Sequence, residues 1–347
     1  MKAINESGRA MIKKLHSIYS NEVPRFIIDL ANTTELKRLE HVGQNCGQDY
    51  LNAEIFNPIF NYSRLDHSIG VALIIWNFTK DIRQSISGLF HDISTPTFAH
   101  VIDFLKKDYV NQEITEVDTI QVIRQSEEIL KILNEYDILP EDVEDYKKYS
   151  IADNKAPKLS ADRLEYTFYL SLTRGKIKIE EVEKIYKRIV ICNNEEDEPE
   201  MVISEPCLAE RLMKISIENG RFMSGKESKI SGQMLADILE LCCNKNILKE
   251  EDLYIYKEEE IVEKIRTSSE KEILSMWELY TKFDEVLESD DYVEGKYCIH
   301  LDVKRRYINP LVFVQEKLIR TIDISNRMKK ILDDYLHDKS VKYIYVK

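Results

Sequence analysis

The feature that most constrains this chain is an apolar pattern of helical period that ends in a His-Asp pair. Between residues 66 and 90, apolar side chains occupy positions 69, 72, 75, 78, 82, 86, 89 and 90. Recurrence every three to four residues is typical of helices that bury one face, and it predicts two helices broken near residue 80. The second helix would then deliver His91 and Asp92 to its carboxyl end.

Composition agrees with a mainly α protein. Hydrophobic residues make up 43% of the 347 positions, which is enough for a sizeable core, whereas the chain has only 10 glycines and 8 prolines. Leu, Ile, Glu and Lys recur at helical spacing, so a helical globular fold is expected. Two stretches are exceptions, because the patterns of residues 297–303 and 341–346 are typical of short strands.

An acidic run, NNEEDEPE at residues 193–200, interrupts the helical pattern. A run of like charges is expected to form a solvated loop. We therefore predict a domain boundary there. Residues 1–192 would hold an N-terminal segment and the helical core, and residues 193–347 would form a mostly helical C-terminal region with a few short strands.

Charge and apolar runs limit the partners of the chain. The net charge of −13 argues against nucleic acid as a partner, because binding its backbone requires Lys and Arg to displace counterions. A small phosphorylated ligand remains compatible, since a local pocket can be basic on an acidic protein. The longest apolar run, residues 71–76, is too short to cross a bilayer, and the first residues lack a signal-type apolar segment. The six cysteines lack CxxC spacing, so we expect a cytoplasmic protein with reduced thiols and no membrane partner.

The His-Asp pair has two potential companions at the starts of other predicted helices, His67 and Asp162. Two imidazoles and two carboxylates at helix ends can converge from different helices. Such a set suits a divalent transition metal such as Zn, Mn, Fe or Ni. A metal there would lower the pKa of a bound water and neutralise charge on a phosphoryl group.

Three strings around these residues carry a resemblance to a known family: RLDHSIGV at 64–71, LFHDISTPTFAH at 89–100 and ADRLEY at 161–166. Their order of His, His-Asp and Asp resembles the H…HD…D signature of the HD-domain phosphohydrolases. More narrowly, residues 35–170 resemble the HD-domain deoxynucleotide triphosphohydrolases. KRRYINPLV at 304–312 is loosely similar to a basic segment of the same group.

The resemblance implies a helical HD-domain core with one metal ion held by His67, His91, Asp92 and Asp162. It implies hydrolysis of a phosphate ester or anhydride, and Mg²⁺ accompanying a nucleotide substrate is a further candidate ion. It suggests that Arg64 and Tyr166 face the substrate and that Gln44 matches a glutamine that contacts the nucleotide. It also suggests a homo-oligomer.

The sequence differs from the family pattern at two positions whose family residues are linked to proton transfer. The family histidine three residues after the HD Asp is Thr95 here, and a downstream His-Glu pair is replaced by Gln112-Glu113. A neutral amide cannot act as a general acid near pH 7, whereas an imidazole can. Glu113 and His100 are the remaining candidates for proton transfer, although His100 could equally be a packed histidine that caps a helix.

Two classes of function follow. The first is an enzyme, a metal-dependent phosphohydrolase acting on a nucleotide, with a deoxynucleoside triphosphate as one candidate. The second is an HD-fold nucleotide-binding or regulatory protein with little turnover, which Thr95 and Gln112 favour and the costly buried polar quartet disfavours. A phosphomonoesterase or phosphodiesterase acting on another small phosphorylated substrate would use the same metal site. The basic run 304–306 would either bind phosphate or pair with acidic surface groups.

Overall fold

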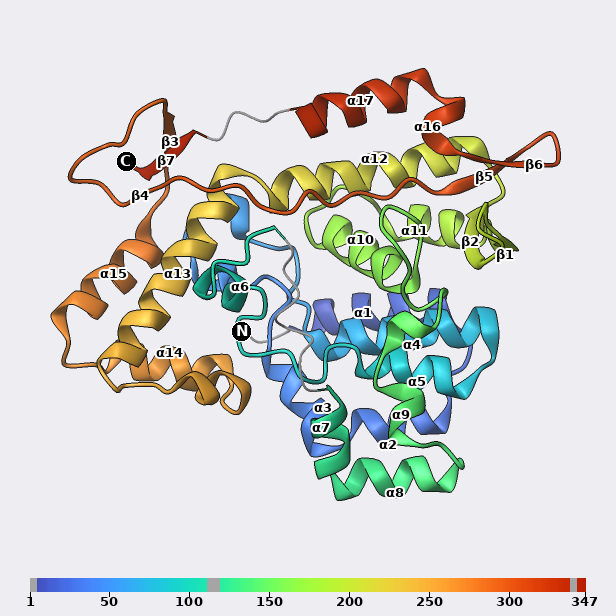
Figure 1. Ribbon diagram of the computed structural model, residues 1–347, viewed down its shortest axis with the longest axis horizontal. Helices are drawn as coiled ribbons and strands as arrows, with labels where there is room; N and C mark the ends of the chain where they lie inside the picture. The colour runs from blue at the N-terminus through green and yellow to red at the C-terminus, as the bar shows by residue number, and fades with distance from the viewer. Residues whose placement is uncertain (1–4, 111–118, 338–341) are drawn as a thin grey trace.

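The computed structural model describes residues 5–110, 119–337 and 342–347, and the mainly α prediction is confirmed (Figure 1). Every helix in these described ranges is too short or too polar to span a membrane. The helices of the first half are α1 (Glu6–Tyr19), α2 (Arg25–Ala31), α3 (Thr34–Arg38), α4 (Arg64–Thr79), α5 (Ile82–Phe90), α6 (Val101–Leu105), α7 (Thr119–Gln125), α8 (Glu127–Glu135), α9 (Pro140–Val143), α10 (Ala161–Thr173) and α11 (Ile179–Tyr186). Those of the second half are α12 (Pro206–Met223), α13 (Lys226–Asn244), α14 (Glu258–Arg266), α15 (Lys271–Lys282), α16 (Thr321–Ile324) and α17 (Asn326–His337).

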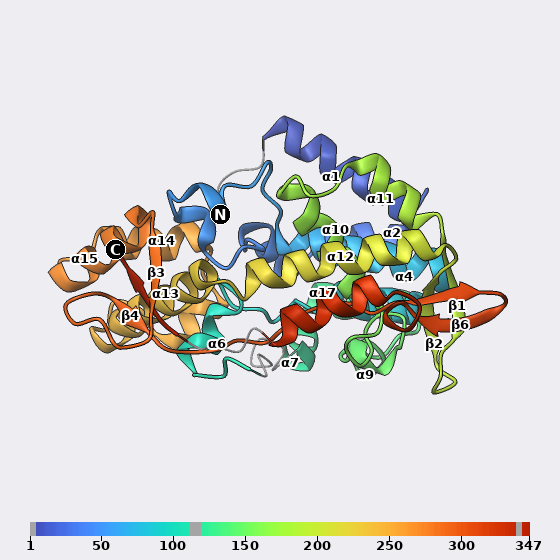
Figure 2. The ribbon, with the colours of Figure 1, turned by 90° about the horizontal axis from the view of Figure 1, so that it is seen from above.

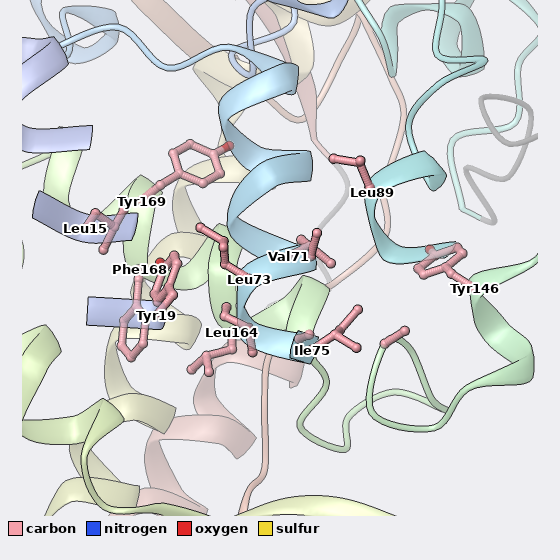
Figure 3. Close-up of a cluster of buried hydrophobic side chains, with 14 of the residues drawn as sticks. Leu15, Tyr19, Val71, Leu73, Ile75, Leu89, Tyr146, Leu164, Phe168 and Tyr169 are labelled. Atoms are coloured by element: carbon pink, nitrogen blue, oxygen red, sulfur yellow. The ribbon is translucent and has the colours of Figure 1, made fainter. Parts of the chain in front are cut away.

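Helix α4 is the central element of the larger hydrophobic core. It begins at a capping box in which the Ser63 hydroxyl accepts from the backbone N–H of Asp66, and it ends at Lys80 in a left-handed conformation. Its apolar side chains pack between α1, α5 and α10 (Figure 3). This arrangement confirms the two predicted helices and the break near residue 80, and it places the buried His67 in the first turn of α4.

A second hydrophobic cluster is built mainly from α6, α13, α14 and α15. It also takes residues from the 51–56 segment, so both halves of the chain contribute to it. The larger cluster likewise continues past residue 193 into β2 and α12. The predicted domain boundary stays a prediction. Position 193 lies at the end of strand β1, and both hydrophobic clusters contain residues from before and after it.

The described residues form two small sheets, which lie at opposite ends of the molecule (Figures 1 and 2). One has the order β1-β2-β5-β6 and the other the order β3-β7-β4. Their strands are β1 (Ile189–Asn193), β2 (Pro199–Ile203), β3 (Val286–Ser289), β4 (Cys298–Ile299), β5 (Leu311–Val314), β6 (Lys317–Arg320) and β7 (Tyr343–Val346). The acidic run at 193–200 is therefore the turn of the β1–β2 hairpin and the start of β2, rather than a loop throughout.

The chain joins the two sheets through residues 300–310, a segment that we call the strap. The sequence predicted a strand over residues 297–303, but β4 covers only two of them and the strap itself is in neither sheet. It runs along α12 from one end of the molecule to the other (Figure 1). An extended chain advances about 3.3 Å per residue, so these eleven residues can span roughly 35 Å. The strap thereby brings C-terminal side chains over the N-terminal core.

Candidate metal centre

Three of the predicted metal ligands converge in the core. His67 lies in the first turn of α4, His91 follows the last residue of α5, and Asp162 lies in the first turn of α10. The Nε2 atom of His67 is 3.1 Å from Nε2 of His91 and 3.1 Å from Oδ1 of Asp162. The third pair, His91 Nε2 and Asp162 Oδ1, is separated by 3.9 Å. These ligand atoms are spaced closely enough to share one ion.

The opposite nitrogen of each imidazole already has an acceptor. The Nδ1 atom of His91 is 2.7 Å from the carbonyl oxygen of Gly88, and Nδ1 of His67 contacts the Glu165 carboxylate. A neutral histidine that donates from Nδ1 has its lone pair on Nε2. Two such lone pairs would face each other, and a positive charge, either a metal ion between the nitrogens or a proton on one of them, makes the arrangement favourable. The residues present thus fit a divalent metal, whose histidine ligands normally donate their other N–H to a carboxylate or carbonyl.

The charges around His67 also favour a positive charge at this position. Burial disfavours the imidazolium, but the carboxylates of Glu165 and Asp162 outweigh it and raise the pKa of His67 to about 10. Without a metal, a proton therefore supplies the missing positive charge at neutral pH. Metal binding has to displace that proton, since a ligating histidine is neutral.

Asp92 lies beside this cluster but is shared with Arg64. The Arg64 Nη1 atom donates to both carboxylate oxygens, at 2.8 and 2.7 Å, and the Thr95 hydroxyl donates to Oδ1 at 2.8 Å. Burial alone would raise the pKa of Asp92, yet Arg64 and the two imidazoles hold it below its usual range. Its Oδ2 atom is 3.5 Å from Nε2 of His91, so Asp92 as the fourth ligand stays a prediction. Arg64, predicted to face the substrate, lines the cavity but already has this carboxylate as a partner.

Glu165 is a site residue that the sequence reasoning missed. Its side chain is fully buried and accepts from the Tyr62 hydroxyl at 2.6 Å as well as from His67. It lies one helical turn after Asp162, so both carboxylates project from the same face of α10. That i, i+3 spacing in ADRLEY was the available signal. Gly70 on α4 allows the approach, because a Cβ there would lie 2.8 Å from the Glu165 side chain.

The cluster opens into a cavity of about 700 Å³. Tyr166, Gln44 and His100, all singled out from the sequence, line it together with the strap residues 303–307. The Gln44 Oε1 atom accepts from the Tyr169 hydroxyl at 3.3 Å. Its Nε2 atom is buried and has no hydrogen-bond partner within residues 5–110, 119–337 and 342–347. The positions of Gln44 and Tyr166 on the cavity wall are compatible with substrate binding, and these roles stay predictions.

His100 belongs to a His-Asp pair on the cavity wall. Its Nδ1 atom is 2.8 Å from Oδ2 of Asp103, whose side chain is fully buried. His100 is at the N-cap position of α6, but its side chain makes no capping hydrogen bond, so the helix-capping interpretation is not supported. Burial lowers the pKa of His100, and the positive charges of Arg306 and Arg64 lower it further against the opposing effect of Asp103.

The other predicted proton-transfer group, Glu113, lies outside the described residues, as does Gln112. Thr95, which occupies the position of a family histidine, hydrogen-bonds to Asp92 instead of offering a titratable group. Among the described residues, His100 is therefore the candidate for proton transfer that the cavity contains.

Comparisons with known proteins relate part of the chain to a metal-dependent phosphohydrolase. No protein-family model matches the chain. It is 27% identical over 322 residues to the uncharacterized protein YdhJ of Bacillus subtilis, covering 92% of this chain and 93% of that one. It is 24% identical over 159 residues to the metal-dependent phosphohydrolase cns2 of Cordyceps militaris, covering 46% of this chain and 44% of that one.

Solved structures share the fold along almost the whole chain. A hypothetical protein from Aquifex aeolicus superposes with a TM-score of 0.63 at 16% identity, covering 93% of each chain. A phosphohydrolase from Bacteroides thetaiotaomicron gives a TM-score of 0.64 at 14% identity, covering 94% of this chain and 96% of that one. At such identities the likeness establishes the fold, whereas the sequence relationship to a metal-dependent phosphohydrolase extends over about half of the chain.

Proposed function

We propose that this protein is a metal-dependent phosphohydrolase of the HD type that hydrolyses a nucleotide. The observation that carries the proposal is the convergence of two imidazole Nε2 atoms and one carboxylate at a 700 Å³ cavity, with both Nδ1 atoms held by acceptors. The sequence relationship to a metal-dependent phosphohydrolase and a structural neighbour named as a phosphohydrolase support it.

His67, His91 and Asp162 would hold the metal, with Asp92 as the candidate fourth ligand. A divalent ion bound there would supply a water of lowered pKa and neutralise charge on a phosphoryl group. Glu165 fixes the orientation and tautomer of His67. Arg64 balances the charge of Asp92, so the centre carries less net negative charge when an anionic substrate approaches.

His100 is the residue to which we assign proton transfer. Because its pKa is lowered, the imidazole is neutral at pH 7 and can accept a proton at Nε2 while Asp103 holds Nδ1–H. This pair would replace the contribution that the family histidine makes at the position of Thr95. Glu113 remains a second candidate.

The dimensions and lining of the cavity favour a nucleotide. A volume of about 700 Å³ falls in the usual range for small-molecule sites. Aromatic rings suitable for contact with a base line the wall, namely Phe104, Tyr146, Tyr166, Tyr169, Phe222 and Tyr307. A deoxynucleoside triphosphate is the substrate that the family resemblance favours.

The test compares metal content and phosphate release on the same samples. Wild type, His91→Ala and Asp162→Ala would be purified and analysed by inductively coupled plasma mass spectrometry, then assayed on a panel of nucleotides, deoxynucleotides and simple phosphate esters. We expect about one metal per chain in the wild type, with metal and turnover lost together in both variants. His337→Ala, which changes an exposed histidine at the end of α17, is the matched control.

Two results would redirect the proposal. Metal bound without phosphate release from any nucleotide would favour a binding or regulatory protein, or a different phosphate ester if that part of the panel is cleaved. Metal content unaffected by either ligand substitution would refute the assigned centre. Light scattering of the wild-type sample tests the homo-oligomer that the resemblance suggests.

A further inference from the structure

The strap contributes a positively charged wall to the cavity of the metal centre. Three consecutive cations, Lys304, Arg305 and Arg306, come from a part of the chain that follows the last predicted metal ligand by more than a hundred residues. The protein as a whole has a net charge of −13, so three adjacent cations make this part of the cavity wall locally positive. The question is whether these charges are already neutralised by the protein.

Arg305 is used to fasten the strap. Its guanidinium contacts Asp302 at 3.4 Å and donates to the Ser224 hydroxyl at 3.2 Å. The same Asp302 carboxylate is 3.1 Å from Nζ of Lys229, a buried lysine on α13. Arg305 and Asp302 therefore anchor the strap to α12 and α13.

The backbone on both sides of Arg306 is held as well. The Lys304 N–H donates to the Tyr109 carbonyl at 3.1 Å, and the Ile308 N–H donates to the Ser216 hydroxyl at 3.0 Å. The Tyr335 hydroxyl donates to the Arg306 carbonyl oxygen at 3.3 Å. The main chain around Arg306 is thus held at Lys304, at Arg306 itself and at Ile308.

Gly220 shows how closely this backbone packs on α12. A Cβ at Gly220 would lie 2.2 Å from the carbonyl oxygen of Arg306, which is a forbidden contact. The absence of a side chain at Gly220 is therefore required for the strap to lie where it does.

The side chain of Arg306 differs from the other arginines of the cavity. Arg64 is paired with Asp92, Arg163 with Asp153, and Arg305 with Asp302. Within the described residues, the Arg306 guanidinium has no hydrogen bond or ion pair to another side chain. Its charge nevertheless acts on His100 and Tyr166, two other groups of the cavity wall.

The carboxylates of the cavity are also already engaged. Those that line it among the described residues are Asp92, Asp153 and Asp162, and they contact Arg64, Arg163 and His67 respectively. A half-buried guanidinium without an internal counter-ion, carried on a backbone that is held in place, therefore lines a cavity whose acidic groups are occupied. A planar guanidinium fork is suited to bidentate contact with phosphate oxygens.

We propose that Arg306 is the specificity-determining residue for the phosphate chain of the substrate, and that the position of the strap brings the Arg306 guanidinium to the cavity where it binds that chain. The inference rests on the proposed function in taking the bound anion to be part of the substrate. Arg306 would bind a phosphate other than the one attacked at the metal centre, so the preferred substrate carries a di- or triphosphate. A monophosphate would lose this contact.

Pyrophosphate binding to the metal-loaded full chain tests this directly. Isothermal titration would be run on wild type, Arg306→Gln, Arg306→Lys and the control Lys317→Gln, which changes an exposed lysine on β6 outside the cavity. We expect Arg306→Gln to weaken pyrophosphate binding about 10- to 100-fold, the range for a charge-assisted hydrogen-bonded contact. Arg306→Lys should recover part of the loss, the control should match wild type, and metal content should be the same in all four.

Kinetics on the cleaved nucleotide provide the second readout. Arg306→Gln should raise KM for a triphosphate far more than for the corresponding monophosphate. Wild-type affinity for pyrophosphate in Arg306→Gln, or no pyrophosphate binding by wild type, would overturn the assignment. Pyrophosphate binding that depends on Arg306 in a protein that cleaves no nucleotide would overturn the proposed function and leave the phosphate site standing.

Discussion

The metal centre and the strap contribute to one cavity, but the chain builds them in opposite ways. The metal centre takes its groups from the ends of three packed helices, and each group is oriented by a partner inside the same core. The strap has no place in either sheet and is held by single hydrogen bonds and one ion-pair cluster spread along its length. The comparison teaches that the proposed chemistry depends on groups oriented within one core, whereas the proposed phosphate contact depends on a segment held by several separate contacts.

The largest effect should come from Glu165, which belongs to the metal centre alone. Glu165→Gln keeps the shape of the side chain but removes the carboxylate that holds His67 Nδ1. Loss of such a partner weakens metal binding by about 10- to 100-fold. Competition with a chelator of known affinity would measure the change.

The matched control for Glu165→Gln is Glu259→Gln, which changes an exposed carboxylate bonded to His41. Pyrophosphate affinity measured at saturating metal should stay at the wild-type value in both variants. Equal metal affinity in wild type and Glu165→Gln would show that His67 needs no carboxylate partner.

Two glycine substitutions test whether the metal centre and the strap can be perturbed independently. Gly70→Ala would push on the Glu165 side chain, 2.8 Å from the new Cβ, and Gly220→Ala would push on the strap backbone, 2.2 Å away. Overpacking of this kind costs about 1–3 kcal/mol in the free energy of unfolding. We expect Gly70→Ala to weaken metal binding roughly tenfold and Gly220→Ala to weaken pyrophosphate binding by a similar factor, each leaving the other property intact.

Thermal unfolding would verify that both glycine variants are folded at the assay temperature. A loss of both affinities in either variant would mean that the metal centre and the strap are not independent. In that case the contrast between them would be wrong.

The metal centre and the strap also differ in how well the sequence predicted them. The helical period up to residue 90 placed His91 correctly, because it depends on contacts a few residues apart. Glu165 was within a string that carried the resemblance, but its role depends on the distance between α4 and α10, which Gly70 sets. A local pattern does not contain that distance.

The strap was harder still. The sequence showed the basic run, and phosphate binding was one of two alternatives. Nothing in residues 304–306 indicates that they line the same cavity as residues of the 44–170 segment. The short strand predicted over 297–303 was mostly wrong for the same reason. An extended segment forms a strand only where a neighbouring strand exists, and beyond β4 the strap meets helix α12 instead.

A pH dependence of the metal-free protein tests the electrostatics of the metal centre. The pKa of His67 is raised to about 10 in the folded state, so its proton stabilises the fold fully below its ordinary pKa of about 6.5. That contribution is lost as the pH rises through 10. We expect the Tm of chelator-treated protein to fall across this interval by several degrees. The metal-loaded protein should show a much smaller change, because its His67 is already deprotonated.

Glu165→Gln supplies the control for the pH experiment, since it removes the principal group that raises the pKa of His67. Its metal-free Tm should depend less on pH over the same range. An identical pH dependence in both proteins would assign the effect to another titrating group.

The smallest effect is expected at the strap. Tyr335→Phe removes only the hydroxyl that donates to the Arg306 carbonyl and keeps the buried ring. One neutral hydrogen bond contributes about 1 kcal/mol, so pyrophosphate affinity should fall by no more than about fivefold, while metal affinity stays unchanged. Tyr280→Phe, which removes a buried hydroxyl bonded to the Gly47 carbonyl, is the matched control. If Tyr335→Phe weakens pyrophosphate binding as strongly as Arg306→Gln, the strap is held by this single contact and can leave the cavity. If it has the small predicted effect, the several weak anchors share the task, and the position of Arg306 is as well determined as that of the helix-borne ligands.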